Sequence, residues 1–416
     1  MQTRAAGWHL FTTRSDTPRP MHRRPIIGVV FGTRPEAIKL APVIFELKNH
    51  SDEFETVLIS TAQHRQMLDQ VLNVFGIAPD LDLNLMTHDQ PLSGITARVL
   101  QKMDSVLAAR RLDLLIVQGD TTTAFGSALA AFFRKIPVAH VEAGLRSRDM
   151  CNPFPEEANR RLASVVTHLH FAPTLLAREN LLGEGVSPDN ILVTGNTVVD
   201  AARMLVERGV ADQPLPAGIP DDGSRLILMT SHRRESWGPE LENICLAVRD
   251  LVEQFPDIRV VYPVHLNPNV RGTVNELLRG IDRVHLTEPM DYFGFLSLLR
   301  RSYLVLTDSG GVQEEAPTFG KPVLVLRKVT ERPEASMQGL SVIVGTSRKR
   351  IVEEASRLLS VGAVYRRMSE AASPYGDGRA SERIAKALGR WFQGVRPALE
   401  EFEQFDVTAE LEVAAA

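Results

Sequence analysis

The chain has very few cysteines and no long apolar run. Only Cys151 and Cys245 occur among 416 residues, and their spacing fits neither a disulfide framework nor a metal site, which favours a reducing, cytoplasmic location. No apolar stretch approaches the ~20 residues that a membrane-spanning helix needs, so we expect no membrane insertion. Lys and Arg number 47 against 51 Asp and Glu, a net charge of −4. Without a basic excess we expect no nucleic-acid partner.

Two familiar phosphate-binding signatures are missing as well. The chain contains neither a GxGxxG dinucleotide fingerprint nor a GxxxxGK[ST] loop. What it does contain is a regular alternation of short apolar runs with longer helical patterns, which is typical of parallel sheets covered on both faces. The expected strands are 26–31, 56–60, 112–117, 138–141, 168–172 and 191–194, then 226–230, 258–263, 284–286, 303–306, 323–326 and 342–344.

The length of the chain exceeds what one hydrophobic core usually supports, so we expect an α/β protein with two doubly wound, Rossmann-like domains and a central cleft. A segment with three prolines and three glycines separates the two runs of alternation. The expected division is a disordered N-terminal extension (1–24), an N-terminal domain (25–208), a linker (209–224), a C-terminal domain (225–378), a helix packing back on the N-terminal domain (379–394) and a tail (395–416).

The first segment that carries chemistry is Phe31–Lys39, which follows the first expected strand and opens a helix. Gly32 permits close backbone approach, and Pro35 suits the first helical turn. A helix N-terminus beside Arg34 is a natural anion site. A capped loop with a solvated arginine explains the same residues, so this segment alone leaves both interpretations open.

Acidic side chains follow at the same expected rim of the first domain. Asp120 ends one strand and Glu142 ends the next, and the crossover helix 124–134 between them places both at the carboxyl edge of the sheet. Glu156 comes directly after Pro155 at a helix start, where the helix dipole favours an acid. The structural alternatives are an N-cap for Asp120 and an ordinary helix start for Glu156.

The second domain repeats this arrangement at its strand ends. His232 stands beside two arginines after the strand 226–230, and Arg332 lies in a further charged turn. The turn Ser309-Gly310-Gly311 leads into a helix, which is a candidate phosphate cradle. Glu315 lies about 6 Å further along that helix, where a carboxylate can accept two ribose hydroxyls. An ordinary glycine-rich turn and solvated charges are the structural alternatives.

Taken in order, these segments resemble the non-hydrolysing UDP-N-acetylglucosamine 2-epimerases of bacteria. The resemblance runs from about Ile26 to Phe392, and the matching motifs are FGTRPEAIK, TAQHRQMLDQVL, QGDTTT, HVEAGLR, PEEANRR, TGNTVVD, HRRES, YPVHLNPNV, LTDSGGVQEEAPTFGKPVLVLR, TERPEA and PYGDGRAS. It implies a fold like that of the GT-B glycosyltransferases, no metal or nicotinamide cofactor, and a homodimer.

The resemblance also implies an activity. Members of this family interconvert UDP-N-acetylglucosamine and UDP-N-acetylmannosamine by eliminating UDP, forming a glycal and adding UDP back. The ligands of this chain would then be the two UDP-sugars and UDP. The product would supply N-acetylmannosamine units for cell-surface polysaccharide.

Individual roles follow from the matching positions. Asp120, Glu142 and Glu156 are implied as the acids and bases at the sugar C2, without a decision on which does which, and His232 completes the catalytic set. The residues implied to contact the diphosphate are Arg34, His232, Ser309, Gly310 and Gly311. Glu315 is implied to contact the ribose and Phe295 the uracil. Lys39 and Arg332 are implied to contact the phosphates or the sugar, and Arg160 the sugar or Glu156.

Some family members carry a second, regulatory site for UDP-N-acetylglucosamine on a Gln-His-x-Gln segment, which here is Gln63, His64, Arg65 and Gln66. Those members also supply an arginine from a segment that in this chain is Met86-Thr87-His88-Asp89. Because no arginine is present there, the regulatory site stays an open hypothesis.

Three other functions share parts of the pattern. A GT-B glycosyltransferase would use the same glycine turn and ribose glutamate, but it has no need of three acids at the N-terminal rim. A hydrolysing epimerase would release free N-acetylmannosamine and UDP. If the protein were a non-catalytic sensor, we would expect at least one of the four proposed catalytic side chains to be missing. All four are present: Asp120, Glu142, Glu156 and His232.

Overall fold

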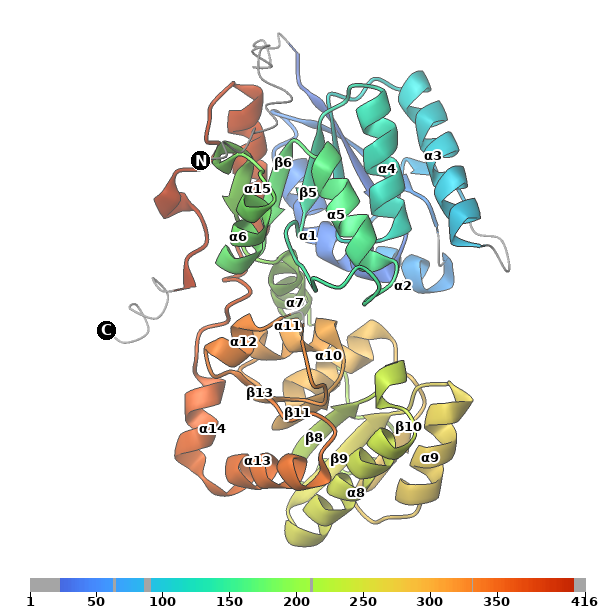
Figure 1. Ribbon diagram of the computed structural model, residues 1–416, viewed down its shortest axis with the longest axis vertical. Coiled ribbons are helices and arrows are strands. Elements are labelled where there is room, and N and C mark those ends of the chain that lie inside the picture. Colours follow the sequence, from blue (N-terminus) through green and yellow to red (C-terminus); the bar gives the residue numbers. More distant parts are fainter. Residues whose placement is uncertain (1–22, 63–64, 86–90, 210–211, 331, 408–416) are drawn as a thin grey trace, which may run out of the picture.

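The computed structural model has two α/β lobes, one above the other, with the first half of the chain in the upper lobe and most of the second half in the lower one (Figure 1). It describes residues 23–62, 65–85, 91–209, 212–330 and 332–407. Each lobe is built on one parallel sheet flanked by helices. The predicted fold class, two doubly wound α/β domains, is confirmed.

The sheet of the first lobe has the strand order β3-β2-β1-β4-β5-β6-β7 within the described residues, and its neighbouring strands are all parallel. Its interior strands are largely apolar, and in β4 every residue is buried, because helices cover both faces. The strands are β1 (Ile26–Phe31), β2 (Glu55–Ser60), β3 (Leu81–Asp82), β4 (Leu114–Gln118), β5 (Val138–Val141), β6 (Leu169–Ala172) and β7 (Ile191–Val193).

The sheet of the second lobe has the order β10-β9-β8-β11-β12-β13, again parallel throughout the described part. Its strands are β8 (Arg225–Thr230), β9 (Ile258–Pro263), β10 (Val284–Thr287), β11 (Leu304–Thr307), β12 (Val323–Val325) and β13 (Ser341–Ile343). In both sheets the order reverses beside the first strand of the lobe, at β1/β4 and at β8/β11. Crevices for ligands open at such switch points, beyond the carboxyl ends of the strands.

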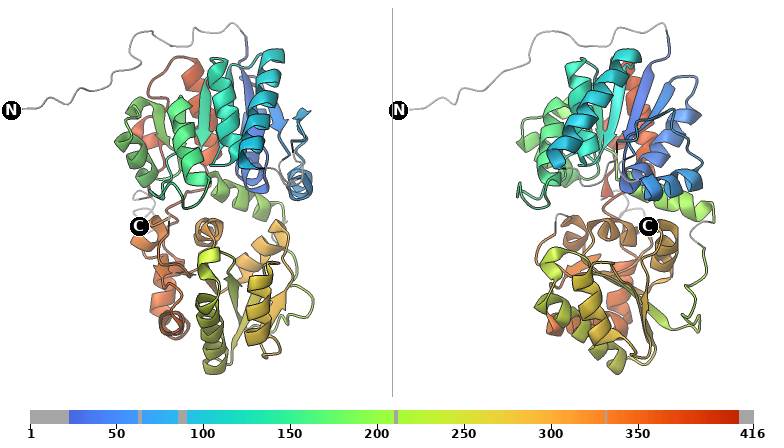
Figure 2. Two further views of the ribbon diagram at one scale, coloured as in Figure 1. Left: turned by 45° about the vertical axis from the view of Figure 1, so that its right-hand side comes forward. Right: turned by 90° about the vertical axis from the view of Figure 1, so that its right-hand side faces the viewer.

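The helices pack in layers on these sheets (Figure 2). In the first lobe they are α1 (Arg34–Asn49), α2 (Arg65–Phe75), α3 (Leu92–Ala109), α4 (Thr122–Phe133), α5 (Glu156–Val166), α6 (Leu175–Gly183) and α7 (Thr197–Glu207). The later helices are α8 (Pro239–Gln254), α9 (Pro268–Leu278), α10 (Tyr292–Arg301), α11 (Gly310–Thr318), α12 (Glu334–Met337), α13 (Arg348–Ser360), α14 (Gly362–Ser369) and α15 (Ala380–Phe392).

Two helices connect the lobes. α7 packs against α1 of the first lobe and α11 of the second. α15 follows the second lobe in sequence, yet it packs against α1 and α7, and in Figure 1 it lies in the upper lobe. The face of α15 that is buried there includes Ile384, Leu388 and Trp391. One apolar core therefore continues from the first sheet through these helices into the second lobe.

The predicted and observed elements differ mainly at their ends. The strand expected at 112–117 is Leu114–Gln118, and the crossover helix expected at 124–134 is Thr122–Phe133. The strand β3 and the short helices α12 and α14 were not predicted. A two-residue edge strand and helices of one or two turns are too short to show a clear hydrophobic period.

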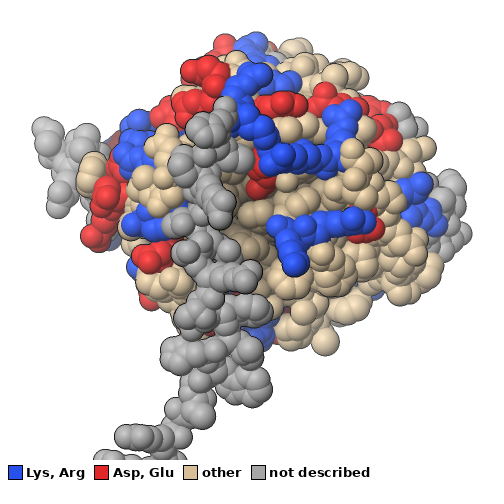
Figure 3. All heavy atoms as spheres, turned by 90° about the horizontal axis from the view of Figure 1, so that it is seen from above, with Lys and Arg blue, Asp and Glu red and all other residues tan. Residues whose placement is uncertain are grey.

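No helix in the described part of the chain is long and apolar enough to cross a membrane. On the face of the first lobe seen from above, the visible side chains include Lys and Arg interspersed with Asp and Glu (Figure 3). This face therefore carries both signs of charge among large uncharged areas, in line with the balanced composition.

Candidate active site

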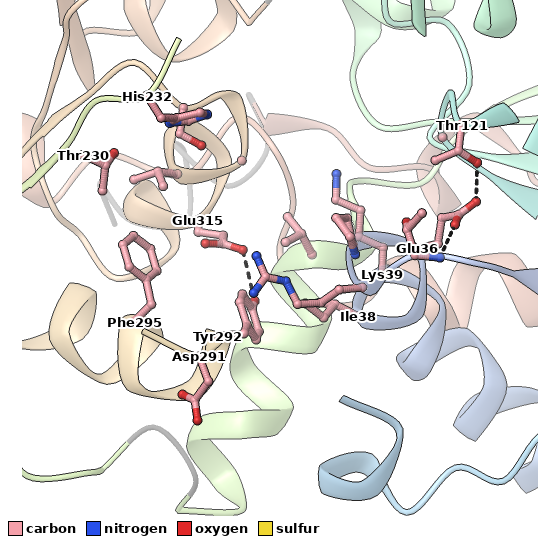
Figure 4. Close-up of a pocket in the computed structure, with 18 of the residues that line it drawn as sticks. Glu36, Ile38, Lys39, Thr121, Thr230, His232, Asp291, Tyr292, Phe295 and Glu315 are labelled. Atoms are coloured by element: carbon pink, nitrogen blue, oxygen red, sulfur yellow. Dashed lines mark hydrogen bonds between the residues drawn. The ribbon is translucent and has the colours of Figure 1, made fainter. Parts of the chain in front are cut away.

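A cavity of about 690 Å³ lies between the lobes, at the carboxyl ends of both sheets (Figure 4). Most of the predicted site residues line it together: Arg34, Lys39, Asp120, Glu142, Glu156, His232, Phe295, Ser309, Gly311, Glu315 and Arg332. Arg160 and Gly310 lie directly behind this lining, in contact with Asp120 and Arg332. Of the predicted regulatory residues, Gln63 and His64 lie outside the described residues, as does the side chain of Gln66.

The loop that carries Arg34 is fixed by a buried carboxylate. Glu36 accepts hydrogen bonds from the backbone N–H of Gly32 at 2.9 Å and of Thr33 at 2.7 Å. Its other oxygen accepts from the hydroxyl of Thr121 at 2.6 Å, which ties the β1 loop to the β4 loop. Burial raises the pKa of Glu36, partly offset by these bonds. The sequence analysis missed Glu36, although the Thr-x-x-Glu pattern of a capping box points to it.

Gly32 is required by close packing. A Cβ at this position would come within 2.0 Å of the Thr61 hydroxyl oxygen and 2.6 Å of that of Thr123. The backbone of the β1 loop can therefore approach its neighbours only because Gly32 has no side chain. This brings the N-terminus of α1, with Arg34, to the wall of the cavity.

Asp120 is held by Arg160 of α5, the helix that begins at Glu156. The Arg160 guanidinium makes a short hydrogen bond to the Asp120 carboxylate and a second one, at 3.0 Å, to Glu157. The partners of Arg160 are thus Asp120 and Glu157, whereas the resemblance had implied a contact to the sugar or to Glu156. The prediction that Asp120 could be an N-cap is wrong, because the hydroxyl of Thr121 caps α4 by accepting from Ala124.

Glu142 lies directly after β5 with a positive φ of 66°, an uncommon backbone conformation that directs its side chain into the cavity. Its carboxylate accepts a short bond from the Lys39 ammonium and one at 2.9 Å from the Asn196 amide. Lys39 also donates to Glu314 at 3.1 Å. Burial acts to lower the pKa of Lys39, but attraction to Glu142 and Glu314 outweighs it and raises that pKa above its usual value.

Glu314 bridges the two lobes. It lies on α11, is buried, and accepts from both Lys39 of the first lobe and the Arg332 guanidinium. Burial acts to raise the pKa of Glu314, and the charges of Arg332 and Lys39 outweigh it, so the carboxyl stays ionised. The Arg332 guanidinium lies over Gly310, where a Cβ would come within 2.5 Å of it. The sequence analysis named Glu315 and missed its neighbour Glu314.

Glu315 faces the cavity from the next position of α11. The Tyr292 hydroxyl donates to it at 3.0 Å, and Phe295 lies nearby on α10 (Figure 4). Burial raises the pKa of Glu315 to about 7, although the Tyr292 hydrogen bond acts in the opposite direction. A buried carboxyl beside aromatic rings suits a ligand that has both hydroxyls and a flat ring system.

His232 stands at the end of β8, across the cavity from Glu36 and Thr121 (Figure 4). Its ring stacks on His265, with centroids 5.9 Å apart and an interplanar angle of 25°. Ser309, the N-cap residue of α11, lies on the same side. At Gly311 an added Cβ would meet open space, so the start of this helix is accessible to a ligand from the cavity.

The chemistry available to this cavity is of two kinds. The first lobe supplies four carboxyl groups, those of Glu36, Asp120, Glu142 and Glu156, and the cations near them lie on both lobes. The second lobe supplies a histidine and a helix N-terminus, which suit an anion. Within the described residues, no group of three or more His, Cys, Asp or Glu side chains is arranged to hold a metal ion.

Comparison with known proteins gives one consistent result. A family model described as UDP-N-acetylglucosamine 2-epimerase matches residues 46–389. The UDP-N-acetylglucosamine 2-epimerase of Escherichia coli strain K12 is 50% identical over 365 residues, which cover 86% of this chain and 97% of that protein. The enzyme of the same name from Yersinia pestis is also 50% identical, with the same coverage.

Solved structures agree. A crystal structure of the UDP-GlcNAc 2-epimerase of Neisseria meningitidis bound to UDP-GlcNAc has a TM-score of 0.81 at 46% identity, covering 87% of this chain and 99% of that one. The structure of S. aureus MnaA with UDP has a TM-score of 0.81 at 43% identity, covering 89% of this chain and 98% of that one.

The two parallel sheets and the cavity between them define a GT-B-like enzyme. Together with the matches across most of its length, this establishes that the chain belongs to the UDP-N-acetylglucosamine 2-epimerase family, a family of isomerases. The family predicted from the sequence motifs is confirmed.

Proposed function

We propose that the protein interconverts UDP-N-acetylglucosamine and UDP-N-acetylmannosamine by eliminating UDP and adding it back to a glycal. The observation that carries this proposal is the meeting of Asp120, Glu142 and Glu156 in one cavity with an anion-binding helix start. Relatives about 50% identical carry the name of this activity, and one similar structure holds UDP-GlcNAc.

The nucleotide occupies the side of the cavity formed by the second lobe. Glu315 accepts the ribose hydroxyls, and Phe295 lies against the uracil. The N-terminus of α11, from Ser309 to Gly311, takes the diphosphate, since the dipole of a helix and the N–H groups of its first turn favour negative charge. His232 and Arg34 approach the same diphosphate from the two lobes.

The sugar occupies the side formed by the first lobe. A base removes the C2 proton, the C–H electron pair forms the C1–C2 double bond, and the C1–O bond breaks with its electrons leaving on UDP. Re-addition reverses each step, with the proton delivered to the opposite face of C2. The reaction therefore needs carboxyl groups on both faces of the ring, and Asp120, Glu142 and Glu156 are the candidates.

The cations serve these carboxylates as well as the phosphates. Lys39 neutralises Glu142 and Arg160 neutralises Asp120 in the absence of substrate. Preorganised positive charge of this kind stabilises the charge that develops on the departing diphosphate. We assign Arg332, which shares Glu314 with Lys39, to the phosphate end of the sugar.

The test is incubation with UDP-N-acetylglucosamine in D2O, followed by NMR. We expect deuterium at C2 and a mixture of two UDP-sugars. Accumulation of UDP with unlabelled substrate would favour a hydrolase or a glycosyltransferase instead. As a control, Asp120→Asn keeps the shape of the site and should bind UDP while losing turnover by at least about 100-fold. Full activity in that variant would refute the role of Asp120.

We further propose that the protein is a homodimer and that its product feeds cell-surface polysaccharide. Support for the dimer comes from apolar side chains that stay exposed on two helices packed together, α4 and α5. They are Phe132, Phe133, Leu162 and Val165, of which Val165 is 81% exposed. Surfaces of this kind mark protein–protein contacts, and sedimentation of the full chain measures the oligomeric state.

A further inference from the structure

Asp308 is a buried carboxylate that the roles above leave unused. It follows β11 directly, and its side chain is fully buried. One oxygen, Oδ2, accepts from the backbone N–H of His232 at 2.8 Å and of Arg233 at 3.0 Å, and from the hydroxyls of Ser231 at 3.1 Å and Ser236 at 3.3 Å. This oxygen thus accepts four hydrogen bonds from the turn that carries His232.

The other oxygen has a different task. Oδ1 lies 3.1 Å from Nδ1 of the His232 ring, within ion-pair distance, and among the described residues no hydrogen bond is formed to it. Burial acts to raise the pKa of Asp308, but the side chain of His232 and the backbone N–H groups of Arg233 and His232 outweigh it, so the pKa stays below its usual value. A buried negative charge therefore faces one nitrogen of His232 and not the other.

We propose that Asp308 is a positioning residue for the epimerase reaction, which holds His232 through Nδ1 and directs Nε2 to the diphosphate. The inference rests on the proposed function. A carboxylate can only accept at Nδ1, so it selects the tautomer with the proton on Nδ1. The ring plane is fixed further by the stack on His265.

The physical consequence concerns the leaving group. When UDP is bound, His232 lies between two anions, the Asp308 carboxylate and the diphosphate. A proton on Nε2, the nitrogen that does not face Asp308, donates to the oxygen that takes up charge as the C1–O bond breaks. In this way Asp308 acts on the leaving group through His232 without touching the substrate.

A purely structural role is the competing explanation, because the four bonds to Oδ2 would justify Asp308 by themselves. Asp308→Asn separates the two roles. The amide oxygen of asparagine can still accept from the backbone N–H groups of His232 and Arg233. Its NH2 group would then face Nδ1 as a donor, which favours the opposite tautomer of the ring.

The first measurement is on the wild-type protein, so it does not depend on a variant that folds. Long-range 1H–15N NMR of the full chain labelled at histidine, with His232→Gln to assign the signal, reports which ring nitrogen carries the proton. We expect Nδ1–H without ligand and both nitrogens protonated with UDP. A neutral Nε2–H ring in either state overturns the proposal. This readout is independent of epimerase activity, so failure of the proposed function would be recognised separately.

The second measurement is turnover. We expect Asp308→Asn to reduce kcat at least about 100-fold with a smaller change in KM. Ser236→Ala removes another donor to the same carboxylate and should stay within about 3-fold of wild type. In the His232→Gln background, adding Asp308→Asn should reduce turnover little further, because Asp308 acts through the His232 ring that is already absent. An equal loss in both backgrounds would show a structural role and overturn the proposal.

Discussion

Neighbouring acids on α11 have opposite ionisation behaviour. Glu314 faces Lys39 and Arg332, whose charges keep its pKa below the usual value. Glu315, one position later, faces Tyr292, and burial raises its pKa to about 7. Two identical side chains thus differ because successive helical positions point about 100° apart, one toward cations and the other toward an aromatic wall.

A pH-dependent stability follows for Glu315. Its pKa is higher in the folded chain than the ordinary 4.5, so folding favours the protonated form. This contribution is present below about pH 4.5 and is lost as the pH rises through about 7. Glu315→Gln keeps an acceptor for Tyr292 and never ionises. We expect this substitution to raise the free energy of unfolding relative to wild type. The increase should be about 2 kcal/mol larger at pH 8.5 than at pH 5.5.

Unfolding curves at the two pH values measure this difference. Glu184→Gln is the matched control, since its pKa is lowered by the hydrogen bond from Arg146 and the substitution should destabilise at high pH. The same gain for Glu315→Gln at both pH values would contradict the prediction.

At the scale of elements, the site is assembled where helices begin after strands. α1 follows β1, α4 follows β4 and α11 follows β11, and all three helix starts reach the cavity. Side chains then link these starts to one another: Glu36 joins α1 to the β4 loop, and Glu314 joins α11 to α1. The cavity is therefore bounded by helix N-termini that buried carboxylates hold together.

Glu314→Ala tests the link between α11 and α1. It leaves the buried Lys39 and the partly buried Arg332 without their shared, fully buried partner, and breaking a buried pair in this way costs about 3–5 kcal/mol. We expect a matching fall in thermal stability, with faster amide exchange in both helices. Glu353→Ala, which removes an exposed pair with Lys349, should change stability by less than about 1 kcal/mol. Similar effects of the two substitutions would argue against the link.

At the scale of the molecule, the chain returns to its first lobe at α15. Asp200 on α7 accepts from the backbone N–H and the hydroxyl of Ser381, both at 2.7 Å, and from the N–H of Ala380 at 3.3 Å. It therefore caps α15 from another helix. Asp377, just before α15, pairs with Arg383 at 2.6 Å. These contacts hold α15 against α1 and α7, close to the segment that leads into the second lobe.

Asp200→Ala should release this attachment. Loss of an N-cap costs about 0.5–2 kcal/mol, and we expect increased hydrogen exchange confined to α15 and the helix face that it covers on α1. Asp200→Asn keeps an acceptor oxygen and should show a smaller effect. Unchanged exchange in α15 of the alanine variant would mean that apolar packing alone attaches this helix.

Much of the fold and of the candidate site could be predicted from the sequence, because parallel α/β proteins repeat a local pattern. Most buried strands are continuous apolar runs, and Asp120, Glu142 and His232 each come shortly after such a run, so their place at the carboxyl ends of the strands was predictable. Glu36 was predictable from its capping box and was overlooked. The roles of Glu314 and Asp308 had no local signal, since each depends on a partner more than 70 residues away along the chain: Lys39 for Glu314 and His232 for Asp308.

The sequence by itself therefore determined the two-sheet fold, the edge on which the site lies and the family, because strand burial and motif order are local properties of the chain. The tertiary structure decided which charges neutralise one another. Lys39 is shared by Glu142 and Glu314, Arg160 holds Asp120, and Asp308 faces His232. Electrostatic pairing depends on distance and burial in three dimensions, and those are set only when segments far apart in the chain pack together, within a lobe for most of these pairs and between the lobes for Lys39 and Glu314.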